Sequence, residues 1–216
     1  MKVAIVQFDN RPIEKLGAMA VLLHRNHQYA VRHGYEYHFI NQAHFDLPVY
    51  WQKPKILHRF FEVGFDVAVW LDSDAVVHDL DRRVEDLFEG GETMVAAPDN
   101  PHWTAPFNAG VFAVRQPGGL ALMDRWSGLF AGTKWTRTPT AWVCEDEWAG
   151  PSYEQGAFNA RLLPELTADG TLRLADWRLL QSPFPVEGAF TLHFPGPFRA
   201  NLVPYIHLYA EGASPA

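Results

Sequence analysis

Two aspartates separated by one residue, Asp72 and Asp74, are the clearest candidates for chemistry in this chain. They follow the apolar, largely β-branched run 67–71, a pattern typical of a strand buried on both faces of a parallel sheet. In an open α/β sheet, ligands bind where strands end at their carboxyl edge. Two carboxylates there repel each other, and a divalent cation would relieve the repulsion while leaving positions open for phosphate groups. The tripeptide therefore predicts a metal-diphosphate site, although the same residues also fit a polar turn.

The surrounding sequence predicts the α/β elements that would position this site. Strands are expected at 2–8, 35–40, 93–97 and 111–114, with shorter candidates at 172–174 and 179–181. Helices are expected at 13–33, 54–63, 80–88, 117–130 and 153–162, the first of them ended by Gly34. A strand, a helix and a second strand in this order imply a right-handed parallel unit. We therefore expect an α/β fold with an open, mostly parallel twisted sheet flanked by helices.

Composition narrows the class of protein. At 216 residues the chain is long enough for one substantial core, so one domain is the default. Its formal net charge of −7, without a basic stripe, argues against a nucleic-acid partner. The single cysteine, Cys144, fits a reducing compartment. Because the apolar run 3–8 is too short for a signal peptide or a transmembrane segment, we expect a soluble, cytoplasmic protein.

Five short motifs occur in order between residues 26 and 196. They are Asn26 with Tyr29-Ala30 and His33–Tyr35, then Lys55–Phe61 before Trp70–Ala75, then Asn108–Phe112, Glu154–Phe158 and His193–Gly196. In this order they resemble the retaining galactosyl/mannosyl/xylosyltransferases, a family of nucleotide-sugar enzymes with the GT-A fold. The glycogenin-like retaining transferases are a second resemblance, through the Asp-x-Asp, the Asn-Ala-Gly and a final His-x-x-Gly-x-x-Lys in which this chain has Arg199. Two features are expected to depart from the first family: we expect no membrane anchor of the kind that family carries, and Glu154 stands where it has Asp.

The resemblance implies a metal-dependent retaining glycosyltransferase that moves a sugar from a nucleotide-diphosphate donor, with a UDP-sugar favoured, to an acceptor hydroxyl. Asp72, Asp74 and His193 would hold Mn²⁺ or Mg²⁺, a Lewis acid for the departing diphosphate. Gly196 and Arg199 would bind that diphosphate through backbone and guanidinium groups. Within a single glycosyltransferase domain, residues 1–98 would bind the nucleotide, and residues 99–216 would bind the donor sugar and the acceptor.

Further residues are candidates for the nucleotide. Asp9 and Arg11 follow the first strand, where the base and ribose lie in the resembled fold. Ser73 either binds the ribose or serves the turn between the aspartates. Lys55 and Arg59 lie one turn apart on the predicted helix before the Asp72 strand; they either steady the diphosphate or form a solvated helix face.

Asn108 and Gln155 are the candidates for the donor sugar. In front-face transfer, Gln155 would stabilise positive charge near the anomeric carbon. A double displacement would instead need a carboxylate nucleophile, either Glu154 or an acid of the cluster 145–147. The other interpretation of these acids is that they lie on a helix surface. Because neighbouring side chains on a helix diverge by about 100°, we expect only one of Glu154 and Gln155 to face the sugar, and we favour Gln155. Three tryptophans either stack on an acceptor sugar or belong to the core: Trp103, Trp135 and Trp142.

Two other functions fit parts of the sequence. A nucleotidyltransferase that makes sugar nucleotides would need a glycine-rich, basic loop after the first strand, and residues 9–12 contain no glycine. A non-catalytic carbohydrate-binding domain would use exposed tryptophans, but it would not need two acids and a distant histidine around a metal.

Overall fold

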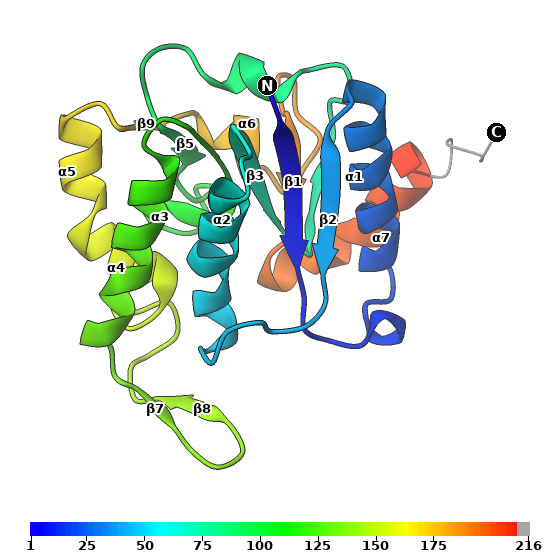
Figure 1. Ribbon diagram of the computed structural model, residues 1–216. Helices are drawn as coiled ribbons and strands as arrows, with labels where there is room; N and C mark the ends of the chain where they lie inside the picture. The colour runs from blue at the N-terminus through cyan, green and yellow to red at the C-terminus, as the bar shows by residue number, and fades with distance from the viewer. Residues whose placement is uncertain (211–216) are drawn as a thin grey trace.

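The computed structural model describes residues 1–210, and its centre is a six-stranded sheet in the order β2-β1-β3-β6-β5-β9 (Figure 1). All strands run in one direction except β6, which is antiparallel to both of its neighbours. The strands are β1 (Val3–Phe8), β2 (Glu36–Ile40), β3 (Val67–Asp72), β5 (Met94–Ala97), β6 (Asn108–Arg115) and β9 (Leu172–Leu174). The predicted α/β class with a mostly parallel sheet is confirmed.

The sheet is covered by helices on both faces because its central strands carry mostly apolar, buried side chains on both faces. In β1, for example, Ala4 and Val6 belong to one core cluster, and Val3 and Ile5 to the cluster on the opposite face. The first face packs against α2 (Gln52–Glu62), α3 (Gly119–Gly128), α4 (Glu154–Arg161) and α5 (Leu163–Ala168). The second face packs against α1 (Met19–His33) and α6 (Trp177–Leu180).

The strand that carries the aspartates is interrupted between them. β3 ends at Asp72, the chain turns at Ser73 and Asp74, and a separate strand, β4 (Ala75–Val77), continues away from the sheet. β4 pairs antiparallel with β10 (Thr191–His193), with His193 opposite Ala75. This register brings His193 beside Asp74 although the two residues are far apart in the sequence.

The helices differ from the predicted ranges in three places. The range 13–33 contains a 3-10 helix, Ile13–Lys15, and then α1, which ends at Gly34 with φ of 70°. The range 80–88 forms only a 3-10 helix, Val84–Leu87. The strand predicted at 179–181 was wrong, because residues 179 and 180 belong to α6 and Gln181 ends it. The first turn of α6 is capped by the Asp176 carboxylate, which accepts a hydrogen bond from the Arg178 amide.

Shorter elements complete the chain. A 3-10 helix, Leu129–Gly132, follows α3 directly. The 3-10 helices Val49–Trp51 and Gly196–Asn201 contribute residues to the cleft described below, and α7 (Leu202–Tyr205) leads into the π-helical turn Ile206–Ala210. The hairpin of β7 (Trp135–Arg137) and β8 (Trp142–Cys144) projects on the side where β1 and β2 end (Figure 1). Within residues 1–210, none of the helices combines the length and the apolar character needed to cross a bilayer.

Candidate active site

A cleft of about 920 Å³ opens where β1 and β3 end. Its walls come from segments spread over the whole sequence, which the sheet and the β4–β10 pair bring together. Eleven of the predicted site residues line it: Asp9, Arg11, Asp72, Ser73, Asp74, Asn108, Glu154, Gln155, His193, Gly196 and Arg199. The two others, Lys55 and Arg59, are not among the lining residues.

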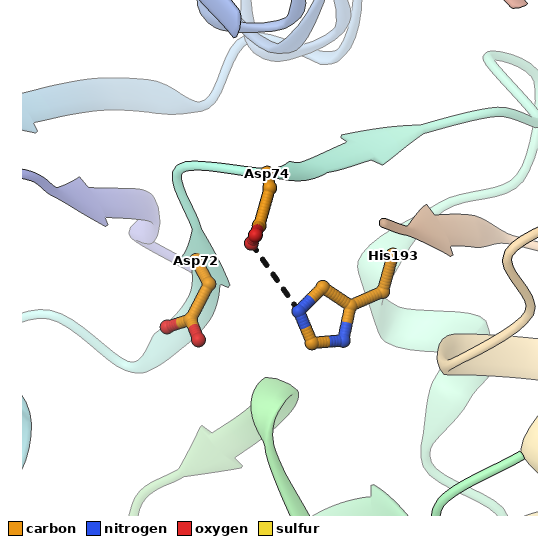
Figure 2. A group of neighbouring side chains, drawn as sticks. All are labelled: Asp72, Asp74 and His193. Carbon is orange, nitrogen blue, oxygen red and sulfur yellow. Dashed lines mark ion pairs between the residues drawn. The ribbon is translucent and has the colours of Figure 1, made fainter. Parts of the chain in front are cut away.

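The predicted metal ligands form one cluster. One ligand atom from each of Asp72, Asp74 and His193 lies within 4.8 Å of the other two, and the two carboxylates and the imidazole face a common space (Figure 2). Ligand atoms on one Mg²⁺ or Mn²⁺ ion lie at most about 4.2 Å apart, twice a metal-oxygen distance of about 2.1 Å. Small side-chain rotations would therefore allow all three residues to bind one ion.

Gln181 determines which nitrogen of the His193 ring carries a hydrogen when the ring is neutral. The Gln181 amide nitrogen donates to the carbonyl oxygens of Val111 at 2.9 Å and Asn108 at 3.3 Å, so its oxygen must face His193 Nδ1, 2.8 Å away. Nδ1 then carries the hydrogen, so Nε2, 3.3 Å from Asp74 Oδ1, is the ring nitrogen left to bind a metal ion, or to donate to Asp74 when the ring is protonated. The donor set therefore fits a divalent metal.

Gly110 makes room for the imidazole. A Cβ at this position would lie 2.1 Å from His193 Cε1, a separation that no side chain can tolerate. This glycine thus lies directly against the candidate metal ligand.

Asp74 is almost completely buried and contacts two cationic or potentially cationic side chains. Its Oδ2 accepts hydrogen bonds from Arg199 Nε at 3.1 Å and Arg199 Nη2 at 2.8 Å, while Oδ1 faces His193. Burial alone would raise the pKa of Asp74, but His193 and Arg199 outweigh it and lower the pKa to about 2. Arg199 itself is half exposed, so it can reach into the cleft.

Asp72 is held through one oxygen. Trp70 Nε1 donates to Asp72 Oδ1 at 2.6 Å, and Lys53 Nζ lies 3.2 Å from the same atom. Because both contacts fall on Oδ1, a metal ion would be bound through Oδ2.

Lys53 is a buried cation in the cleft that the sequence analysis missed. Its Nζ donates to the Ala109 carbonyl at 2.6 Å and lies 3.4 Å from Glu154 Oε1, in addition to Asp72. Burial would lower the pKa of Lys53, but the two carboxylates raise it. The predicted cations on the same helix point elsewhere: Arg59 is exposed and pairs with Glu62 at 2.6 Å. Lys53 therefore takes the place in the cleft that we expected of Lys55.

Glu154 and Gln155 both line the cleft, and which of them faces the donor sugar stays a prediction. Both belong to the first turn of α4, where Glu154 turns to Lys53 and the Gln155 side-chain oxygen accepts a hydrogen bond from the Ala109 amide at 2.9 Å. Glu154 is buried rather than on a helix surface, and burial raises its pKa. The acidic cluster 145–147 does not line the cleft; its Asp146 pairs with Lys134 at 2.6 Å.

Asp9, Arg11 and Ser73 form a polar network beside the metal cluster. Arg11 donates through its backbone amide and its Nε to Asp9 Oδ1, at 2.9 Å and 2.8 Å, and Ser73 Oγ donates to Asp9 Oδ2 at 2.6 Å. Burial alone would raise the pKa of Asp9, but these hydrogen bonds lower it. The network links the end of β1 to the turn between the two aspartates.

Asn108 is oriented by a residue that sequence analysis did not select, Asp99. The Asn108 amide nitrogen donates to the Asp99 carboxylate, and its oxygen accepts from the Gly110 amide at 2.7 Å. Asp99 also lines the cleft, and burial raises its pKa. Its place two residues after the end of β5 was the only sequence signal for this residue.

The aromatic side chains of the cleft are largely not the predicted ones. Trp103 lines it beside Gly196, but Trp135 and Trp142 lie on the β7–β8 hairpin and are not among its lining residues. Instead, aromatic residues that we had not selected line the cleft, among them Tyr50, Trp148 and Tyr153.

Comparison with known proteins places the fold. No protein-family profile matches the chain, and no curated protein matches it. Among solved structures, a glycosyltransferase involved in the glycosylation of the major capsid of PBCV-1 aligns with a TM-score of 0.73 and 16% identity, over 96% of this chain and 100% of that chain. The glycosyltransferase GlyE of Streptococcus pneumoniae TIGR4 aligns with a TM-score of 0.55 and 14% identity, over 96% of this chain and 64% of its own. The chain therefore has the fold of glycosyltransferases, in agreement with the GT-A fold that its sequence motifs implied.

Proposed function

We propose that this protein is a metal-dependent glycosyltransferase that transfers a sugar from a nucleotide-diphosphate donor to an acceptor hydroxyl. The observation that carries the proposal is the convergence of Asp72, Asp74 and His193 in one cleft with the basic Arg199. Two acids and a histidine are ligands for Mn²⁺ or Mg²⁺, and a guanidinium beside them suits a diphosphate. A fold shared with glycosyltransferases supports this function.

The chain's own groups would bind the donor at several points. A divalent metal, when bound, supplies Lewis-acid stabilisation of the charge that develops on the departing diphosphate. Arg199 would turn from Asp74 towards the phosphates, and the backbone at Gly196, in its left-handed conformation with φ of 54°, would approach them closely. Asp9, Arg11 and Ser73 would contact the ribose and base, for which we keep UDP as the favoured nucleotide.

Asn108, Gln155 and Glu154 would surround the donor sugar. During transfer the bond from the anomeric carbon to the β-phosphate oxygen breaks, the acceptor oxygen bonds to that carbon, and the acceptor proton passes to the released diphosphate. We favour this front-face, retaining course, with Gln155 stabilising positive charge near the anomeric carbon. A double displacement through Glu154 is less favourable, because the Glu154 carboxylate is buried and contacts Lys53 and is therefore a poor nucleophile.

An inverting course would need a free carboxylate base for the acceptor, and Asp99 is the residue in the cleft that fits that role. The two courses are separated by the anomeric configuration of the product, read by proton NMR. A product with the donor's configuration supports retention, and the opposite configuration contradicts it.

The function is tested with a panel of nucleotide sugars, each with Mn²⁺, with Mg²⁺ and with excess chelator. Release of nucleoside diphosphate should require the metal and should be lost in Asp74→Asn. The control Asp81→Asn changes an exposed acid that pairs with Arg32 outside the cleft, and it should behave like the wild type. Full activity in excess chelator would refute metal dependence. Pyrophosphate release from a nucleoside triphosphate and a sugar phosphate would instead indicate a nucleotidyltransferase, and metal-independent sugar binding without turnover a carbohydrate-binding domain.

A further inference from the structure

Three aromatic rings that line the cleft form a cluster of their own. Tyr50, Trp148 and Tyr153 contact one another pairwise, with ring centroids 5.0 Å apart for Tyr50 and Trp148 and 5.2 Å apart for each of the other two pairs. Tyr50 and Tyr153 are partly buried, but 68% of Trp148 is exposed. We call these three residues the aromatic platform. An exposed tryptophan at a cleft wall is a large apolar surface left open to a ligand.

The loop that carries Trp148 is held firmly in place. Ala149, the next residue, has a left-handed backbone with φ of 59°, which is unusual for a residue with a side chain. The loop backbone lies so close to α4 that a Cβ at Gly156 would be 2.1 Å from the Gly150 carbonyl oxygen. The Ser152 carbonyl also accepts hydrogen bonds from Trp51 Nε1 at 2.9 Å and Trp135 Nε1 at 2.7 Å. Trp148 is therefore presented on a pre-organised loop, so that little freedom is lost when a ligand binds.

The platform adjoins the residues assigned to the reacting sugar. Tyr153 directly precedes Glu154 and Gln155, and Trp148 belongs to the loop that leads into the same helix. The residues assigned to the nucleotide come from other segments, the ends of β1, β3 and β10. The acceptor hydroxyl must reach the anomeric carbon beside Gln155, so the rest of the acceptor has to lie along the wall that continues from this residue.

From this arrangement we infer that the aromatic platform binds the acceptor, and that the acceptor is a carbohydrate whose pyranose ring packs its apolar face on Trp148. The inference rests on the proposed function, because it takes Gln155 to mark the donor sugar. A sugar ring fits the chemistry of this wall, since it offers C–H groups to the indole and hydroxyls to the polar groups nearby.

The test measures donor and acceptor separately in the wild type, Trp148→Ala and Trp148→Phe. Methyl glycosides of glucose, galactose, mannose and xylose serve as acceptor probes, with affinity followed by calorimetry, and metal-dependent donor hydrolysis without acceptor serves as the second readout. Trp148→Ala should weaken acceptor binding about five- to thirtyfold and leave donor hydrolysis unchanged; Trp148→Phe should lie between. The control is Trp177→Phe, a partly buried tryptophan of α6 that does not line the cleft and should change neither readout.

Each combination of results decides one question. Unchanged glycoside affinity in Trp148→Ala, with donor hydrolysis intact, would overturn the platform and leave the glycosyltransferase proposal standing. Trp148-dependent glycoside binding without any donor hydrolysis would keep a sugar site on the platform but overturn the proposed function. If neither the donor nor any glycoside is recognised, both proposals are overturned.

Discussion

Removal of the buried cation Lys53 should destabilise the protein strongly, since it would leave two carboxylates without their partner. Lys53 Nζ lies 3.2 Å from Asp72 Oδ1 and 3.4 Å from Glu154 Oε1, and both Lys53 and Glu154 are buried. At an effective dielectric constant of about 20, two charges 3.4 Å apart attract by roughly 5 kcal/mol. Breaking a buried pair by removing one partner costs about 3–5 kcal/mol. We therefore expect Lys53→Met to lower the free energy of unfolding by about that amount, or the melting temperature by about 6–20 °C for a domain of this size.

A double-mutant cycle with Glu154→Gln identifies the cause of this loss. If the unpaired Glu154 carboxylate is responsible, Lys53→Met combined with Glu154→Gln should be more stable than the sum of the single changes by about 1–3 kcal/mol. Urea unfolding followed by circular dichroism measures each term. The control is Arg59→Met, which removes an exposed cation from the same helix and should change stability by less than about 0.5 kcal/mol. Additive single changes, or a loss no larger than that of Arg59→Met, would refute the reasoning.

Three further predictions concern the metal cluster. The pKa of Asp74 is lowered from 3.8 to about 2 in the folded protein, so its charge should contribute about 2 kcal/mol to the free energy of unfolding above pH 4. This contribution should be lost as the pH falls from about 4 to 2. Urea unfolding at several pH values should show a shallower acid dependence in Asp74→Asn, and equal slopes in both proteins would contradict the assignment. Gly110→Ala would place a Cβ 2.1 Å from the His193 ring, so the Mn²⁺ affinity measured by calorimetry should fall roughly ten- to a hundredfold. The control Gly128→Ala, which has open space around its Cβ, should bind Mn²⁺ with the affinity of the wild type. Gln181→Leu removes the acceptor that keeps the hydrogen on Nδ1 of His193 and should weaken Mn²⁺ binding by a similar factor; a folded variant with wild-type affinity would disprove that role.

The sequence alone determined the fold class and the central acids of the site. Buried parallel strands are encoded by contiguous apolar residues, and the two carboxylates at the end of β3 are read from three neighbouring positions. Gly34 was likewise predicted as the end of α1, because its left-handed conformation is a local property of the chain. Such features depend on neighbours in the sequence, which are visible without a structure.

Only the tertiary structure decided which charged groups enter the cleft. Lys53 and Lys55 are two residues apart on α2, so their side chains point about 200° apart, and the packing of the helix determines which one is buried. Glu154 becomes a buried ion-pair partner because Lys53, from a distant segment, contacts it. No local sequence pattern predicts a contact between such distant segments.

The same holds for α6 and for the aromatic platform. Leu179 and Leu180 suit a strand, but the Asp176 cap starts a helix, which leaves Gln181 beside His193 to fix the tautomer of the ring. Trp148 lies in the least regular part of the sequence, and it reaches the cleft because Gly156 lets its loop pack against α4. These positions depend on contacts between segments far apart in the chain, which the sheet and the β4–β10 pair bring together.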